Sequence, residues 1–349
     1  MKEYVNTIIY TTLEAVNLEL MNNKNVLCLG ELLYRLQAKE ENFFNNTSSL
    51  VYAYPGGSEA NVAVALAELG VPTTYVSSAP QHSLTAEILN ILNHKNVDTS
   101  KFIFGGERLG SYILQSANGL SNGEVIYDRK YSSFSTLKTE DIDWDGLFDN
   151  CTWFHWTALT PALNADLADL MLTALKIAHE KKITISVDLN YRSRLWQYGE
   201  QPLDIMPKLV GYCHVIMGNI WAANKMLGTT ISDQLNRNTS SKDYFDYANI
   251  VANEIFVKYP HCKHIANTFR FMDNPQHNLF YGTYHTPIEN KISAILETNE
   301  VIDRIGSGDA FMAGLIAAIY QKKSSQEIID LATELGFKKL FNKGDFINL

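Results

Sequence analysis

The chain has 349 residues, of which 46% are hydrophobic and 19% are charged, and its formal net charge is −9. This length fits one large α/β domain with an appendage, or two domains, and the negative charge argues against a nucleic-acid surface. The apolar runs are too short to span a membrane. Glu3 and Glu14 interrupt the N-terminal segment, so no signal peptide is predicted and a cytoplasmic protein is expected.

The first predicted strand follows an N-terminal extension, residues 1–24, whose role is unknown. The apolar run Val26–Leu29 predicts a buried strand that ends at Gly30 and Glu31. Residues 32–56 are then largely polar, with short alternating segments that are typical of small strands. This order indicates an α/β sheet whose first strand is followed by an excursion.

A glycine-rich loop at Gly56 and Gly57 begins the first strongly helical segment, whose apolar face repeats with helical spacing up to a stop at Gly70. A strand and a second helix follow. Residues 102–135 then contain short strands without helices. We expect this second excursion to form a small antiparallel sheet.

From residue 153 onward, predicted strands and helices alternate. The strands cover residues 153–155, 183–188, 215–217 and 264–267, and the helices cover residues 165–181, 203–210, 220–227 and 244–259. Such alternation indicates a parallel, doubly wound sheet that binds ligands beyond the carboxyl ends of its strands. Asp188 and the segment Gly306–Asp309 are both expected at that edge of the sheet.

The segment Gly306–Asp309 precedes a strongly apolar helix and has the features of an anion site. Two glycines two residues apart let the backbone turn tightly, and the unpaired N–H groups and positive dipole end of the helix attract a phosphate. Asp309 adds a carboxylate in the first turn, which suggests phosphoryl transfer. The alternative is a glycine-rich turn with a helix-capping aspartate.

Two further polar clusters are candidates for ligand contacts. Asp188, Asn190 and Arg192 follow a predicted strand, and the alternative there is a loop salt bridge. Tyr127 and Arg129 lie on one face of a predicted strand and together can hold a carboxylate or hydroxyl group. The alternative for this pair is the solvated face of a small sheet.

In their order and spacing, these motifs resemble the ribokinase-like (PfkB) sugar kinases. The matching residues are Gly56, Gly57 and Asn61, then Asp188, Asn190 and Arg192, then Asn219 followed by Gly228, and finally Gly306 to Phe311. Within that family, the chain is most similar to 2-keto-3-deoxygluconate kinases, on the basis of Gly30, Glu31, Tyr112, Tyr127, Arg129, Leu195 and Trp196.

The resemblance implies a fold. We expect three α/β/α layers with a doubly wound, mostly parallel sheet, formed by a kinase domain at residues 25–349. A small β-strand lid would come from the two excursions, near residues 32–56 and 102–135. The resemblance also implies ATP and Mg²⁺ as cofactors of the reaction.

The resemblance assigns roles to individual residues. Asp309 would be the general base, and the N–H groups of Gly306, Ser307 and Gly308 would hold the transferring phosphoryl group. The substrate-binding residues would be Gly56, Gly57, Asn61, Tyr112, Tyr127, Arg129, Arg192 and Asp309. The nucleotide-binding residues would be Asn190, Asn219, Thr268, Arg270, Gly306 and Gly308.

Two segments depart from the family pattern. The family's Asn-x-x-Glu motif begins here at Asn219 but has Ala222 at the glutamate position, so the metal ligands stay unassigned. The family's Thr-x-Gly-x-x-Gly loop begins at Thr268 but lacks both glycines. Our hypothesis is that the Arg270 side chain replaces backbone N–H contacts to a phosphate.

The predicted function is ATP-dependent phosphorylation of a small acid sugar, most similar to that of 2-keto-3-deoxygluconate kinases. Arg129 and Arg192 favour an acid sugar, which needs a fixed cation, over a neutral one. The alternatives are a kinase for a neutral sugar or a nucleoside, and a catalytically degenerate sugar-binding sensor. The expected partners are the sugar, ATP and further copies of the chain bound through the lid, and neither nucleic acid nor membrane.

Overall fold

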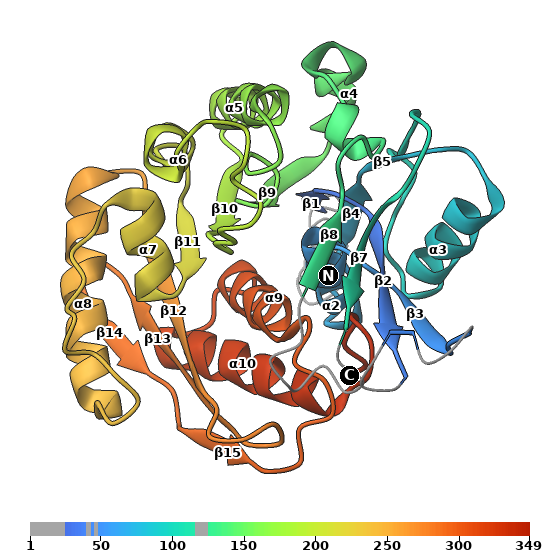
Figure 1. Cartoon of the computed structure of the whole chain (residues 1–349). Helices are drawn as coiled ribbons and strands as arrows, with labels where there is room; N and C mark the ends of the chain where they lie inside the picture. The colour runs from blue at the N-terminus through green and yellow to red at the C-terminus, as the bar shows by residue number, and fades with distance from the viewer. Residues whose placement is uncertain (1–24, 40–42, 45–47, 116–124) are drawn as a thin grey trace, which may run out of the picture.

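The computed structural model describes residues 25–39, 43–44, 48–115 and 125–349, which form a large central sheet and a smaller second sheet (Figure 1). The predicted N-terminal extension, residues 1–24, lies outside the described residues, and so do parts of the two predicted excursions.

The central sheet is mostly parallel, which confirms the predicted fold class. Its parallel strands are, in spatial order, β4 (Thr73–Val76), β1 (Asn25–Leu29), β9 (Cys151–Thr157), β10 (Thr184–Asp188), β11 (Val215–Gly218) and β12 (His264–Phe271). The strand order reverses at β1, since β4 lies on one side of it and β9 to β12 on the other. The carboxyl ends of the strands on both sides of this point therefore border one crevice.

The far edge of the central sheet is antiparallel, a feature that the sequence pattern does not predict. Strand β13 (Asn278–His285) pairs with β12, and both β14 (Asn290–Ile292) and β15 (Leu296–Thr298) pair with β13. The last two strands have three residues each, and so short a segment shows no recognisable hydrophobic period.

Helices cover both faces of the central sheet (Figure 1). One face packs against α2 (Ser58–Glu68), α3 (Ser83–His94), α9 (Ser307–Tyr320) and α10 (Ser325–Lys338), and the other against α5 (Ala165–Glu180), α6 (Pro202–Val210), α7 (Ile220–Leu227) and α8 (Ser241–Lys258). In β1, Val26 and Cys28 belong to the core on the face of α2, α3, α9 and α10, and Leu27 and Leu29 belong to the core on the face of α5 to α8. This alternation follows from the two-residue period of a strand.

The second sheet, called the small sheet below, has four strands. Their spatial order is β3 (Val51–Gly56), β2 (Leu33–Ala38), β7 (Gly110–Leu114) and β8 (Val125–Asp128). Strand β2 pairs antiparallel with β3 and parallel with β7, and β7 pairs antiparallel with β8. The strands thus come from both excursions, and the small sheet lies near β1 and β4 of the central sheet (Figure 1).

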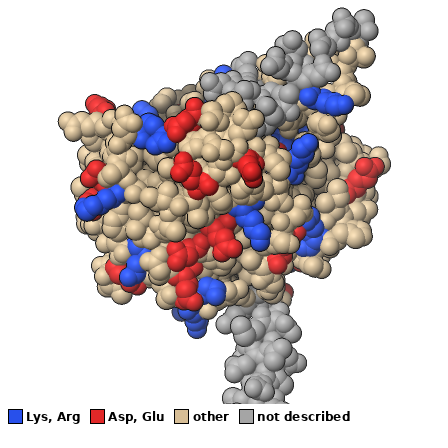
Figure 2. Space-filling model, turned by 90° about the horizontal axis from the view of Figure 1, so that it is seen from below, with Lys and Arg blue, Asp and Glu red and all other residues tan. Residues whose placement is uncertain are grey.

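The remaining elements are short. They are β5 (Ser78–Ala79), β6 (Ile103–Phe104), α4 (Trp144–Leu147) and the 3₁₀ helices η1 (Phe134–Thr136), η2 (Thr139–Asp141) and η3 (Lys339–Phe341). None of the helices in the described ranges is both long and apolar enough to cross a membrane. On the face that Figure 2 shows, acidic and basic side chains are interspersed, and the described residues form no continuous basic band there.

Candidate active site

A cavity of about 560 Å³ lies between the small sheet and the carboxyl ends of the central strands. Of the residues predicted from the sequence to bind substrate or nucleotide, those that line it are Gly57, Asn61, Tyr112, Tyr127, Arg129, Asn190, Arg192, Asn219, Thr268, Arg270, Gly306, Ser307, Gly308 and Asp309. Gly56 is buried beside the wall, where the Asp345 carboxylate occupies the space that a Cβ at Gly56 would need. The fold therefore brings together residues from both halves of the chain.

The glycine-rich segment forms the N-terminal end of α9, as predicted. Gly306 precedes the first helical residue and has φ 80°, which favours glycine. A Cβ there would lie 2.3 Å from the Asp345 carbonyl oxygen, so the close approach of the chain's last residues also requires a glycine. The Ser307 N–H donates to the Arg304 carbonyl oxygen at 3.3 Å, whereas the first turn of a helix otherwise leaves its N–H groups unpaired. This end of α9 faces the cavity and can bind an anion.

The Asp309 carboxylate is held by two side chains of α2. Ser58 Oγ donates to Asp309 Oδ1 at 2.6 Å, and Asn61 Nδ2 donates to Oδ2 at 2.6 Å. Asn190 Nδ2 in turn donates to Ser58 Oγ at 3.0 Å. Burial raises the pKa of Asp309, and the hydrogen bonds from Ser58 and Asn61 oppose this shift. The carboxylate is thus fixed at the cavity wall.

Asn61, Asn190 and Ser58 together hold the Asp309 carboxylate in place, which the sequence alone does not predict. The resemblance predicts that Asn61 contacts sugar and that Asn190 contacts nucleotide; both line the cavity, and both also belong to the hydrogen-bond network around Asp309. Ser58 was not among the predicted site residues. Its position three residues before Asn61 is a signal that could have found it, because such residues share one face of a helix.

Two more buried carboxyl groups lie near Asp309. Burial, together with the charge of Asp309, raises the pKa of Asp188 to about 7, and Asp188 lines the cavity. Burial also raises the pKa of Glu59 to about 7, although Glu59 accepts hydrogen bonds from the N–H and hydroxyl groups of Thr157. Three acids in one desolvated region favour binding of a cation or retention of protons.

Arginine side chains surround the anion site. Arg270 is exposed to the cavity and donates from Nη1 to Ser307 Oγ at 3.1 Å. Withdrawal from bulk water and the charges of Arg192 and Arg304 lower the pKa of Arg270 to about 10, so it stays cationic near neutral pH. Arg304 Nη2 donates to the carbonyl oxygens of Pro275 at 2.6 Å and His277 at 2.9 Å, which fixes the β12–β13 hairpin to the backbone just before the glycine-rich segment.

The small-sheet end of the cavity contains Asp345, a residue that no sequence motif singles out. Tyr112 Oη donates to Asp345 Oδ2 at 2.7 Å, and the fully buried Arg35 lies 3.1 Å from Asp345 Oδ1 through Nε. Burial raises the pKa of Asp345 to about 6. Asp345 belongs to no motif, and it reaches the cavity only because the C-terminal residues fold back along the small sheet.

Arg35 connects the small sheet to the backbone just before the glycine-rich segment. Its guanidinium binds Asp303 through two nitrogens, with Nη2 to Oδ2 at 2.6 Å and Nη1 to Oδ1 at 3.3 Å. Asp303 also accepts hydrogen bonds from the N–H groups of Ile305 at 3.0 Å and Gly344 at 3.1 Å. The backbone just before Gly306 is therefore fixed by a charge from β2.

The cavity wall at α7 has Ala222 at the position of the expected glutamate. Ala222 lines the cavity and is 4% exposed, and the Asn219 side chain caps α7 by accepting from the Ala222 N–H at 2.8 Å. Within the described residues, no group of three or more His, Cys, Asp or Glu side chains could hold a metal ion. Asp188 is the acidic side chain near Asp309 that faces the cavity and could contribute one ligand.

Comparison with known proteins adds independent findings. A model of the pfkB family carbohydrate kinases matches residues 23–256. The crystal structure of 2-dehydro-3-deoxygluconokinase from Thermotoga maritima is 31% identical and covers 93% of this chain and 96% of that chain, with a TM-score of 0.83. The 2-dehydro-3-deoxygluconokinase of Bacillus subtilis is 24% identical over 328 residues, which cover 93% of this chain and 92% of that protein. The 2-dehydro-3-deoxygalactonokinase of Haloferax volcanii is 29% identical over 171 residues, which cover 49% of this chain and 53% of that protein.

The raised pKa of Glu59 predicts a pH-dependent stability. Between its ordinary value of 4.5 and its folded value of about 7, the folded chain keeps a proton on Glu59 that the unfolded chain has lost. The stabilisation from this group therefore falls as pH rises through that window, by at most about 1.4 kcal/mol per pH unit. We expect the free energy of urea unfolding of the wild type, relative to Glu59→Gln, to decrease between about pH 5 and pH 8. The same change at the exposed Glu334 should give no such trend, and a flat difference for Glu59 would contradict the assignment.

Proposed function

This chain belongs to the PfkB family of carbohydrate kinases, and from this membership we propose that it transfers the terminal phosphoryl group of ATP to a hydroxyl group of a small acid sugar. The proposed substrate is 2-keto-3-deoxygluconate, also called 2-dehydro-3-deoxygluconate, and the proposed product is its 6-phosphate. The single observation that carries the proposal is the placement of Asp309 beside the N-terminal end of α9, in one cavity with arginines at both of its ends.

The geometry supports an in-line transfer with Asp309 as the base. The sugar hydroxyl oxygen bonds to the γ-phosphorus, the bond from that phosphorus to the β,γ-bridging oxygen breaks, and the hydroxyl proton passes to Asp309. The transition state of phosphoryl transfer is loose, so the main tasks of the protein are to position the groups and to stabilise negative charge. The N-terminal end of α9 and Arg270 supply this stabilisation, because both face the same part of the cavity.

The proposal of an acid substrate is supported by Arg129 and Arg192, which line the cavity on different elements. A carboxylate gains two parallel hydrogen bonds from a guanidinium, whereas a neutral hydroxyl needs no fixed cation. The relatives from T. maritima and B. subtilis are named for this acid sugar, which agrees with the proposal. A neutral-sugar kinase is the second candidate, because Glu31 already neutralises the charge of Arg129.

We propose ATP as the phosphoryl donor and Mg²⁺ as its metal ion. Two solved structures with this fold contain bound ATP, one of them together with Mg²⁺. The residues present fit a magnesium ion that relies mainly on phosphate oxygens and water, with Asp188 as one carboxylate ligand. Such an ion would neutralise phosphate charge, and its charge would favour the ionised form of Asp188.

Asp309→Asn tests the proposed reaction. The variant keeps the hydrogen-bonding size of the side chain but cannot accept the hydroxyl proton, so turnover should fall about a hundredfold or more. The measurement is ADP release from ATP and Mg²⁺ over a panel of acid and neutral sugars, with the wild type active on 2-keto-3-deoxygluconate. Asp330→Asn, at an exposed aspartate of α10, is the control and should retain full turnover.

The same panel separates the alternatives. Preference for a neutral sugar or a nucleoside would replace the proposed substrate while leaving a kinase. Tight sugar binding in calorimetry, with neither nucleotide binding nor ADP release, would instead show a degenerate sensor. Unchanged turnover in Asp309→Asn would remove the base from the mechanism.

Arg270→Met tests the proposed replacement of the family's glycine-rich loop. Because Arg270 reaches the anion site through Ser307, the KM for ATP should rise about tenfold while the KM for the sugar stays constant. The matched control is Arg237→Met, since Arg237 pairs with Asp273 at 2.8 Å and does not line the cavity. Equal ATP affinity in wild type and Arg270→Met would exclude a phosphate contact by this side chain.

We propose that the small sheet acts as a lid and also joins two copies of the chain. On the face away from the cavity, the register places Ala53, Leu36, Ile113 and Ile126 side by side as an apolar row across all four strands. Ile126 is 39% exposed and Ala53 is also exposed, so a second copy would cover apolar surface that water now contacts.

Ile126→Asp tests this interface. A charge in the apolar row should shift the chain from dimer to monomer in sedimentation velocity at micromolar concentration, because burying an unpaired carboxylate is unfavourable. The matched control is Ile288→Asp, at an isoleucine that is 91% exposed and lies outside the small sheet. A monomeric wild type, or a variant that stays dimeric, would contradict the proposed interface.

A further inference from the structure

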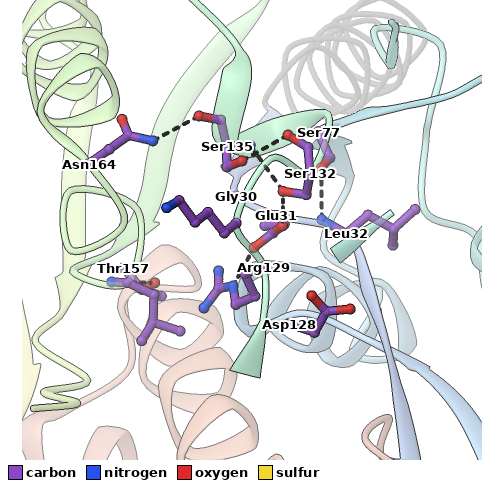
Figure 3. A network of polar contacts seen from close by, with 12 residues as sticks. Gly30, Glu31, Leu32, Ser77, Asp128, Arg129, Ser132, Ser135, Thr157 and Asn164 are labelled. Atoms are coloured by element: carbon purple, nitrogen blue, oxygen red, sulfur yellow. Dashed lines mark hydrogen bonds and ion pairs between the residues drawn. The ribbon is translucent and has the colours of Figure 1, made fainter. Parts of the chain in front are cut away.

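The Glu31 carboxylate has no role in the proposed reaction, yet it is buried and makes specific contacts. It follows β1, is 2% exposed, and accepts from Arg129 Nε through Oε2 and from Ser132 Oγ through Oε1. Figure 3 shows Arg129 and Ser132 on either side of this carboxylate. Among the described residues, Glu31 is the one hydrogen-bonding partner of the Arg129 side chain.

The Glu31 carboxylate is itself fixed by a second set of contacts. Ser132 Oγ accepts from the Ser135 N–H at 3.1 Å, and Asn164 Nδ2 donates to the Ser135 carbonyl oxygen at 2.8 Å. These contacts form a continuous path in Figure 3 from Asn164, the N-terminal cap of α5, to Glu31. A Cβ at Gly110 would lie 2.2 Å from Glu31 Oε1, so β7 also packs closely against the carboxylate. Glu31 therefore has little freedom to move.

The contact between Glu31 and Arg129 uses only one of the three guanidinium nitrogens. Glu31 binds the guanidinium through Nε, while Arg129 lines the cavity, so the two terminal nitrogens are left for a ligand. Those nitrogens can form two parallel hydrogen bonds with a carboxylate, provided that the guanidinium plane is held in one orientation. Because Glu31 also neutralises the charge of Arg129, orientation rather than net charge would discriminate between substrates.

We propose that Glu31 is a positioning residue that orients Arg129 toward the carboxylate of the acid sugar and so sets the preference for acid over neutral sugars. The inference rests on the proposed function, and it adds a residue that acts on substrate choice without touching the substrate. Arg129 directly follows β8, and Glu31 lies between β1 and β2. The residues that would select acid sugars therefore lie where the small sheet joins the central sheet.

Glu31→Gln tests the inference. Glutamine keeps the size of the side chain but has one acceptor oxygen where the carboxylate has two, so it cannot accept from Arg129 Nε and Ser132 Oγ through separate oxygens as Glu31 does. We expect the KM for 2-keto-3-deoxygluconate to rise about tenfold or more, with kcat and the KM for ATP changed less than about threefold. Activity on neutral sugars needs no oriented guanidinium and should stay constant, which a general loss of structure would not produce.

A double-variant cycle shows whether Glu31 acts through Arg129. If it does, Glu31→Gln combined with Arg129→Ala should have the same KM as Arg129→Ala alone. The matched control is Asp128→Asn, which removes a neighbouring carboxylate that pairs with Arg108 at 2.5 Å and lies apart from Glu31 in Figure 3. This control should leave both KM values unchanged.

The outcomes are distinct. A wild type that phosphorylates no acid sugar would overturn the proposed function, whereas an active wild type with an unchanged KM in Glu31→Gln would overturn the inference alone. Additive effects in the double variant would also overturn it. If Glu31→Gln does not fold, Ser132→Ala takes its place, because it removes one support of the carboxylate and should raise the same KM by a smaller factor.

Discussion

A buried set of charged side chains fixes the small sheet, the backbone before Gly306 and the C-terminal residues relative to one another. Arg35 of the small sheet binds two carboxylates: that of Asp303, just before the glycine-rich segment, and that of Asp345, in the C-terminal residues. Lys339 is buried beside both carboxylates. Two cations balance two anions, so desolvation is offset by close pairing and by backbone donors. Removing one member of such a set leaves a charge unpaired, which typically costs about 3–5 kcal/mol.

The position of the cavity follows from this arrangement. Asp345 touches Gly306 through its carbonyl oxygen and Tyr112 through its carboxylate, so the C-terminal residues join the anion site to the small sheet. Arg129, at the small-sheet end, is fixed separately by Glu31. A sugar bound against the small sheet would therefore present its hydroxyl group to Asp309 at a distance that the fold sets in advance, and catalysis gains most from such pre-set geometry.

Two segments of the chain depart from the sequence pattern of its family. Ala222 stands at the position of the family's acidic residue, and Arg270, in the segment where the family has a glycine-rich loop, donates to Ser307 Oγ beside the N-terminal end of α9. Asp188, which lines the cavity, and the buried Glu59 have raised pKa values because burial disfavours their charged forms. The cavity is thus lined by both arginine and aspartate side chains.

The sequence by itself determined the features that depend on local signals. The alternation of strands and helices predicted the parallel sheet, and the segment Gly306–Asp309 predicted an anion site at a helix end, because periodicity and glycine content are read over a few neighbouring residues. Only the tertiary structure decided that Ser58 and Asn61 hold Asp309, that Asp345 enters the cavity and that Glu31 holds Arg129. Each of these contacts joins residues far apart in the chain, and no local pattern specifies which distant side chains the packed layers bring together.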